Sequence, residues 1–232
     1  MSLETKEKKA VILLSGGMDS ATCLAIAASQ GYCCYSLAFD YGQRHSRELE
    51  MACKQASAWN VIEHNEICVE ISKVGRSSLT ADIAVPKTNS QSEIPNTYVP
   101  ARNAVFMSLG LSWAETLAAR HIFIGANQVD YSGYPDCRRD FIEAFEKMAN
   151  LATRMGTEGR KIRIHAPLLD MDKAAIIEKG IELGVDFANT HSCYDPGPGA
   201  RACGRCPSCR LRLKGFQKAG IEDPIDYITR DA

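Results

Sequence analysis

Short apolar runs alternate with helical patterns over the first two thirds of the chain. The apolar runs predict strands at residues 9–14, 32–39, 61–69, 121–126 and 161–167. Apolar residues recurring at three- and four-residue spacing predict helices at residues 19–30, 46–59, 102–119, 138–154 and 173–183. This alternation is typical of stacked βα units. We therefore expect an α/β fold with an open parallel sheet and helices on both faces.

The pattern weakens in two places. Residues 70–96 lack a firm period and are interpreted as a long irregular insertion, a kind of segment that often forms a lid or binding loop. After residue 186 the chain becomes rich in Cys, Gly, Pro and Arg. We therefore expect a main α/β domain over residues 8–186 and a separate C-terminal segment with a tail over residues 187–232.

Composition limits the function classes. The chain has 232 residues, of which 45% are hydrophobic, enough for one sizeable core. The formal net charge of −1 supplies no cationic field of the kind that binds nucleic acids, which argues against a nucleic-acid partner. No signal peptide or membrane-spanning run is recognisable, so a cytoplasmic protein is expected. Ten cysteines in such a chain favour reduced thiols or a metal site over disulfides.

A glycine-rich turn, SGGMDS at residues 15–20, follows the first predicted strand directly. At the carboxyl edge of an open sheet, glycines let backbone amides approach an anion, and the following helix adds the positive end of its dipole. The turn therefore predicts a phosphate-binding loop. A plain turn with Ser or Asp capping the helix also fits these residues. The turn matches neither the Walker loop nor G-x-G-x-x-G.

Four cysteines in the tail have the spacing C-x9-C-x2-C-x2-C and fit an all-thiolate zinc site: Cys193, Cys203, Cys206 and Cys209. Four thiolates leave no coordination position open, so a structural role is expected. A redox dithiol, an iron–sulfur cluster and unbound thiols are the alternatives. Basic residues nearby, including Arg212, fit an RNA-contacting ribbon, a solvated face or an anion-binding edge; the net charge favours the last two. Cysteines 23, 33, 34, 53 and 68 are expected in the core.

Polar loops follow the predicted strands or open helices at residues 39–45, 99–103 and 127–137. With SGGMDS and the four-cysteine tail, the motifs FDYGQRH, PNTYVPARN and DYSGYPDC resemble the 7-cyano-7-deazaguanine synthase family of the PP-loop ATP pyrophosphatases, over residues 9–213. The resemblance implies an ATP-dependent C–N ligase. It would convert 7-carboxy-7-deazaguanine and ammonia to the nitrile, through an activated carboxylate and an amide, in queuosine biosynthesis. The chain has Ala101 where a glycine is common in this family.

The resemblance also assigns residues. The candidate catalytic residues are Asp19, which would help to position Mg²⁺, Arg102 and Lys173. The residues implied for ATP binding are Leu14, Ser15, Gly16, Gly17, Met18, Asp19, Ser20, Ala21, Thr22, Cys23 and Leu24. Those implied for substrate binding are Tyr41, Gln43, Arg102, Asn103, Asp130, Tyr134 and Asp136. The zinc ion would be structural.

Several alternatives stay open. By its spacing alone, Lys173 fits a solvated helix face equally well. A tRNA thiolase with Cys137 as its sulfur-carrying thiol, and a non-enzymatic nucleotide sensor, are the rival functions. The loop type favours AMP plus pyrophosphate over ADP plus phosphate as products. The resemblance favours a homodimer, and free ammonium is the expected nitrogen donor.

Overall fold

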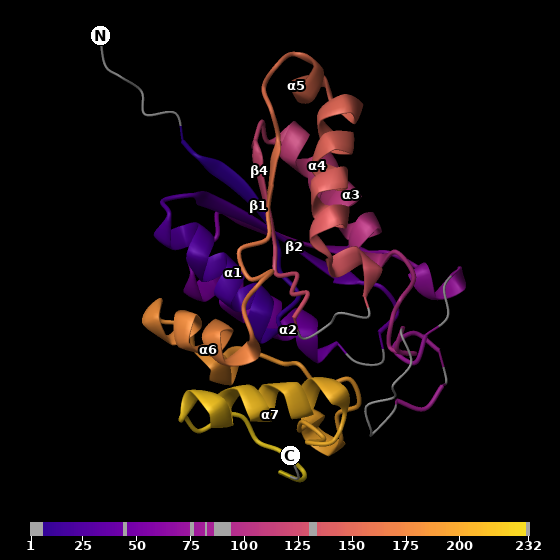
Figure 1. Ribbon diagram of the computed structural model, residues 1–232, viewed down its shortest axis with the longest axis vertical. Coiled ribbons are helices and arrows are strands. Elements are labelled where there is room, and N and C mark those ends of the chain that lie inside the picture. The colour runs from indigo at the N-terminus through magenta and orange to yellow at the C-terminus, as the bar shows by residue number, and fades with distance from the viewer. Residues whose placement is uncertain are drawn as a thin grey trace.

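The computed structural model describes residues 7–43, 46–74, 77–81, 83–85, 94–129 and 134–230. A five-stranded, wholly parallel sheet forms its centre, in the order β3-β2-β1-β4-β5 (Figure 1). The strands are β1 (Lys9–Leu13), β2 (Cys33–Asp40), β3 (Glu63–Cys68), β4 (His121–Ile124) and β5 (Arg163–His165). The strand order reverses between β1 and β4, and open α/β sheets bind ligands at such a reversal.

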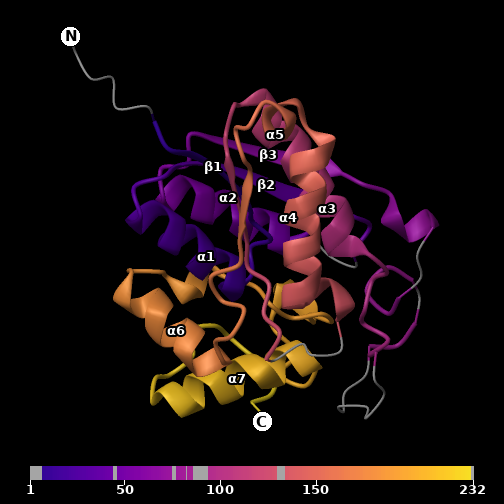
Figure 2. The same ribbon diagram turned by 45° about the horizontal axis from the view of Figure 1, so that its top comes forward.

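Helices cover both faces of the sheet. They are α1 (Met18–Ser29), α2 (Arg47–Ala58), α3 (Arg102–Thr116), α4 (Arg139–Ala152), α5 (Arg154–Thr157), α6 (Lys173–Glu182) and α7 (Pro207–Ala219). Helices α3 and α4 pack on one face, and α1 and α2 pack on the other. Helix α6 packs against α1, and α7 packs against α6, so these helices extend the second layer outward (Figures 1 and 2).

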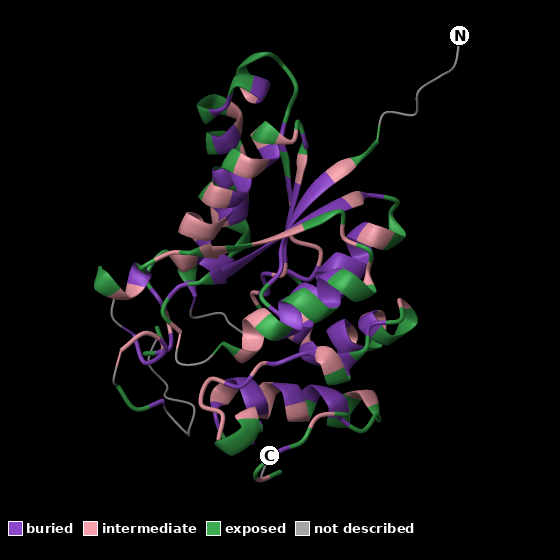
Figure 3. Ribbon diagram, turned by 180° about the vertical axis from the view of Figure 1, so that it is seen from behind, coloured by how far each residue is buried: buried purple, intermediate pink, exposed green. Residues whose placement is uncertain are grey.

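The central strands are buried on both faces (Figure 3). In β1, Val11 and Leu13 belong to the apolar cluster beneath α3 and α4. Ile12, pointing to the opposite face, belongs to the cluster that contains Leu24 of α1. A parallel strand covered by helices on both sides must be apolar at consecutive positions, which explains the run AVILL.

The predicted α/β fold is confirmed, with the predicted strands and helices in place. The strands predicted at residues 61–69 and 161–167 are shorter, at Glu63–Cys68 and Arg163–His165. Helix α7 is absent from the sequence-based prediction. Its inner face carries Arg212 and Gly215 beside Phe216 in place of a regular aliphatic stripe, so its period is hidden. Within the described ranges, no helix is both long and apolar enough to cross a membrane.

Arg212 anchors the C-terminal segment inside the protein. Its side chain is 1% exposed and donates to both carboxylate oxygens of Asp223, at 2.8 and 2.9 Å. It also donates to the hydroxyl of Thr190 at 2.6 Å and to the carbonyl of Phe187 at 3.0 Å. Arg212 is therefore a buried structural residue, and its interpretation as part of a solvated face or RNA-contacting ribbon is wrong. The expectation of core positions is also wrong for Cys53 and Cys68, which are exposed.

Candidate active site

The loop between β1 and α1 is held by two other parts of the chain, helix α2 and the segment at His191. Gly16 has a left-handed φ of +81°, and a Cβ there would lie 2.0 Å from the carbonyl oxygen of Glu48 in α2. The carbonyl of Gly16 accepts hydrogen bonds from the side-chain amide of Gln55, at 3.0 Å, and from the backbone of His191, at 2.9 Å. Only glycine fits this position, and the contacts fix the loop before any ligand binds.

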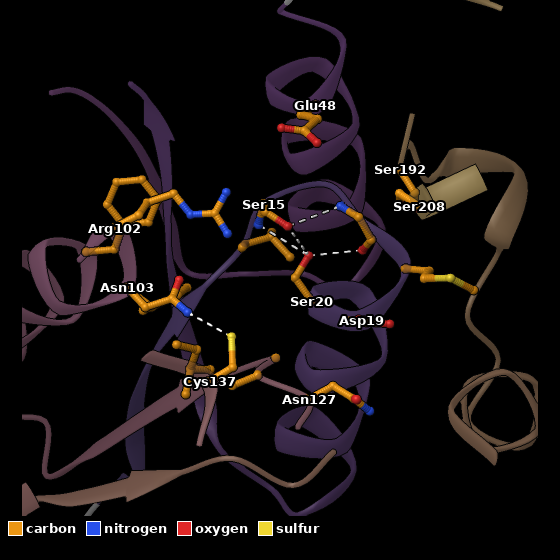
Figure 4. A pocket seen from close by; sticks show the side chains of 18 of the residues that line it. Ser15, Asp19, Ser20, Glu48, Arg102, Asn103, Asn127, Cys137, Ser192 and Ser208 are labelled. Carbon is orange, nitrogen blue, oxygen red and sulfur yellow. Dashed lines mark hydrogen bonds between the residues drawn. The ribbon is translucent and has the colours of Figure 1, made fainter. Parts of the chain in front are cut away.

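Two hydroxyl groups organise the same loop. The Ser20 hydroxyl accepts hydrogen bonds from the backbone N–H of Ser15, at 3.2 Å, and from its side chain, at 3.1 Å, and donates to the carbonyl of Gly17 at 3.0 Å. The backbone of Gly17 donates to the Ser15 hydroxyl at 3.3 Å. These bonds curl the loop over the N-terminus of α1 (Figure 4). The curled backbone and the helix terminus form a concave site suited to phosphate.

Lys173 and Asp19 meet across this helix terminus. The ammonium of Lys173, at the start of α6, donates to both carboxylate oxygens of Asp19, each at 2.8 Å. The side chain of Lys173 is 6% exposed. In α7, Gly215 makes room for it, since a Cβ there would lie 2.5 Å from Cγ of Lys173. A lysine on a solvated helix face is therefore excluded, and the two residues share one site.

A pocket opens at the carboxyl ends of β1, β2 and β4, with about 1190 Å³ of space that includes the open solvent at its mouth. The loop after β1 forms its floor, α2 and α3 supply one wall, and the segment that contains the four cysteines supplies another. At the end of β4, Gly125 lets the strand approach α1, because a Cβ there would lie 3.0 Å from the backbone of Asp19 and Ser20.

One wall combines an arginine with aromatic rings. Phe39 and Phe106 stack with centroids 4.0 Å apart, and Tyr41 lies against Phe106 at 5.6 Å. Arg102 donates to the Tyr41 hydroxyl at 3.4 Å and lies over its ring. Burial raises the pKa of Tyr41 to about 12, so its hydroxyl stays protonated. No carboxylate among the described residues forms an ion pair with Arg102, so its charge is available to an anionic ligand.

The predicted substrate residues differ in their placement. Tyr41, Arg102, Asn103 and Tyr134 line the pocket. Asp136 lies behind it, where its carboxylate accepts a hydrogen bond at 2.9 Å from the backbone N–H of Asn103 and so caps α3.

Gln43, a further substrate candidate, does not line the pocket. Gln43 bonds back to the backbone of Tyr41, at 2.8 Å, and of Phe39, at 3.2 Å. Asp130 lies outside the described residues.

The predicted ATP-binding residues also differ in their placement, since some line the pocket and others do not. Leu14, Ser15, Gly17, Met18, Asp19 and Ser20 line the pocket. Gly16 is the part of the loop that packs against α2. Ala21, Thr22, Cys23 and Leu24 are fully buried in α1. They belong to the helix that carries the loop and present no side chain to the pocket.

Ala101 stands in a left-handed conformation, with φ of +54°, immediately before α3. This conformation explains a preference for glycine at the position, since a Cβ costs about 1 kcal/mol there. We expect Ala101→Gly to raise the melting temperature by roughly 2–4 °C with unchanged ligand binding, measured by thermal unfolding. A lower melting temperature would show that the strain is compensated elsewhere.

Sequence reasoning missed several residues that line the pocket: Glu48, Asn127, His191, Ser192, Tyr194 and Ser208. Glu48 lies inside a predicted helix, where a charged residue is ordinary. His191, Ser192, Tyr194 and Ser208 come from the C-terminal segment, which the sequence analysis places outside the main domain. Asn127 lies in a loop that was singled out, and its side chain donates to the carbonyls of Leu168 and Met171.

The four tail cysteines gather in one buried cluster. Their Sγ atoms lie within 4.8 Å of one another, close to the edge of about 3.8 Å that a zinc–thiolate tetrahedron has. Backbone N–H groups donate to the Sγ atoms of Cys193 and Cys203 at 3.2–3.4 Å. A hydrogen bond from Cys193 helps to lower the pKa of Cys206 to about 7. The donor set fits a structural zinc ion.

The fold and the loop after β1 define an α/β protein with an open parallel sheet and a glycine-rich loop at the carboxyl edge of that sheet. The family described as "Queuosine biosynthesis protein QueC" matches residues 9–220, and the chain belongs to this family. A 7-cyano-7-deazaguanine synthase of Citrifermentans bemidjiense is 58% identical over 95% of this chain and 98% of its own. That of Pseudomonas putida is 57% identical over 95% and 99%.

Solved structures show more distant similarity. An NMN synthetase from Francisella tularensis superposes with a TM-score of 0.49 and is 15% identical, over 94% of this chain and 79% of its own.

Proposed function

We propose that this protein converts 7-carboxy-7-deazaguanine, ammonia and ATP to 7-cyano-7-deazaguanine, as an ATP-dependent C–N ligase of queuosine biosynthesis. Identity of 57–58% to synthases of that name, over 95% of this chain, supports the proposal. The observation that carries it is the pocket itself. It joins a phosphate-binding loop, a wall of aromatic rings and an arginine that forms no ion pair with any described residue.

The chemistry requires positioning and charge stabilisation more than a protein nucleophile. A carboxylate is a poor electrophile, so ATP must first convert one of its oxygens into a leaving group. Ammonia then forms the amide, and a second activation removes the amide oxygen to leave the nitrile. Arg102 would neutralise the substrate carboxylate or a phosphate, and Tyr41 and Phe106 would contact the planar base.

Ser15, Gly17 and Ser20 would hold the phosphates of ATP, with Lys173 beside them. Asp19 would help to hold Mg²⁺ by exchanging one of its contacts with Lys173 for the ion. Mg²⁺ would neutralise phosphate charge. The four cysteines would hold zinc away from the chemistry. We further propose a cytoplasmic homodimer, whose subunit number sedimentation would measure.

The thiolase alternative finds no support in the state of Cys137. Its thiol lines the pocket, but burial, with Asp136 nearby, raises its pKa to about 11. A sulfur carrier reacts as the thiolate, and this thiol is protonated near neutral pH. Cys137 also accepts a hydrogen bond from the side chain of Asn103 at 3.2 Å, which fits a structural role.

Mass spectrometry of the protein with Mg-ATP, ammonium and 7-carboxy-7-deazaguanine tests the proposal. We expect the nitrile together with AMP and pyrophosphate, and a loss of on the order of 10²-fold or more in turnover for Arg102→Ala. Arg120→Ala is the matched control, because Arg120 is exposed and outside the pocket. An unchanged base in the presence of bound ATP would refute the proposal, and tRNA would then be tested as the acceptor.

A further inference from the structure

Glu48 lines the pocket, and the proposed reaction assigns it no role. Among the described residues, two carboxylates line the pocket, those of Glu48 and Asp19. The carboxylate of Asp19 is held by Lys173. Glu48 lies in the first turn of α2, and its carboxylate makes no hydrogen bond or ion pair with any residue in the described ranges. Glu50, two positions further on, points outward and pairs with Arg47 at 2.6 Å.

The surroundings of Glu48 suit a small cation. Figure 4 shows the side chains of Glu48, Arg102 and Ser15 converging on one part of the pocket, from α2, α3 and the loop after β1. The rings of Phe39, Tyr41 and Phe106 line the same pocket. A carboxylate and aromatic faces together attract an ammonium ion. Arg102 opposes a cation until its own charge is neutralised by an anionic ligand, so this part of the pocket would attract ammonium once the carboxylate substrate is bound.

We propose that Glu48 binds the ammonium ion and takes one of its protons, which makes it the base that delivers ammonia to the activated carboxyl carbon. The inference rests on the proposed function. The Glu48 carboxylate becomes a carboxylic acid, and the nitrogen lone pair forms the C–N bond. The activated C–O bond breaks, with its electron pair going to the nucleotide leaving group. The surplus proton on nitrogen passes to solvent.

The protonation behaviour of Glu48 agrees with this role. Withdrawal from water raises the pKa of its carboxyl to about 7, against the opposing effect of Arg102. A stronger base makes proton transfer from ammonium less unfavourable. The titratable and charged groups that share the pocket are Asp19, Tyr41, Arg102, Tyr134, Cys137, Lys173, His191 and Tyr194.

The test uses Glu48→Gln in the full-length, zinc-loaded protein, with Glu50→Gln as the matched control on the same helix turn. With ammonium, Glu48→Gln should lose on the order of 10²-fold in kcat/KM, the usual contribution of a general base. With hydroxylamine, which is already largely uncharged near neutral pH, its rate should match that of the wild type. Substrate-dependent pyrophosphate exchange without ammonium should also be unchanged. Glu50→Gln should resemble the wild type in all three assays.

The pH profile gives a second readout. For the wild type, kcat/KM for total ammonium should rise as Glu48 loses its proton, near pH 7. For Glu48→Gln it should follow the free-ammonia fraction of the solution instead. An ordinary glutamate ionises near pH 4.5, well below folded Glu48, so the folded state loses stability as pH rises between these values. Glu48→Gln should therefore unfold at the same or a higher temperature than the wild type above pH 7.

Wild-type use of ammonium by Glu48→Gln would overturn the inference and leave the proposed function intact. Equal loss with ammonium and hydroxylamine, or loss of pyrophosphate exchange, would also overturn it, by assigning Glu48 to activation or folding. Absence of nitrile from the wild type itself would reject both the proposed function and the role of Glu48.

Discussion

Replacing Lys173 with methionine is expected to lower carboxylate activation on the order of 10³-fold, because the phosphates of ATP would lose a cation fixed beside them. Methionine retains most of the buried stem that packs against Gly215. Pyrophosphate exchange in the presence of the carboxylate substrate measures the step directly. The matched control is Lys179→Met on the same helix, since Lys179 pairs with Glu182 at the surface and should have little effect.

Lys173→Met also leaves Asp19 without its cation, so lost stability must be separated from lost chemistry. Breaking a buried pair from one side costs up to about 3 kcal/mol in a site that water still reaches. The double variant Asp19→Asn with Lys173→Met removes both charges and should recover much of that stability. It should stay inactive. Recovery of activity together with stability would show that Lys173 only maintains the fold.

The main domain was predictable because its signals are local. The run AVILL has the composition of a strand buried on both faces, and SGGMDS lies where such a sheet binds phosphate. The pairing of Lys173 with Asp19 was harder to predict. It joins positions 154 residues apart, and the spacing around Lys173 fitted an exposed face equally well.

The C-terminal half of the site was not predictable by the same reasoning. Helix α7 buries Arg212 through four specific hydrogen bonds, an arrangement that leaves no apolar period in the sequence. His191 and Ser208 enter the pocket only because the segment folds back onto α1 and α6. Asp136 differs from these residues, because it lies in a loop that the sequence does indicate, while its carboxylate accepts a hydrogen bond at the start of α3.

Because this segment folds onto the main domain, a metal ion held by the four cysteines would affect activity at a distance. Cys206 is the N-cap of α7, and Cys209 lies in its first turn. The same helix carries Ser208 into the pocket and packs Gly215 against Lys173. A zinc ion would therefore fix the end of α7 nearest the pocket. Without the ion, four neighbouring thiols could not all remain ionised, and the loops around them would lose their common attachment.

Cys206→Ser is accordingly expected to reduce bound zinc from about one ion per chain to near zero. Losing about 4 kcal/mol of metal-linked stability would lower the melting temperature by about 10 °C. Nitrile formation should fall with the folded fraction and with the loosened contact at Lys173. Metal analysis by mass spectrometry and thermal unfolding with and without chelator measure these effects. Cys53→Ser, an exposed cysteine outside the cluster, is the control and should behave as the wild type.

Cys206→His separates loss of the ligand from loss of the thiol. Histidine supplies a nitrogen that zinc accepts in tetrahedral sites, so this variant should retain the metal and most of the stability. Because four protein ligands would leave no open position, the activity of Cys206→His should follow its zinc content. Full activity of a zinc-free Cys206→Ser protein would contradict the attachment of α7 through the metal. Loss of activity with zinc retained would place Cys206 in the chemistry instead.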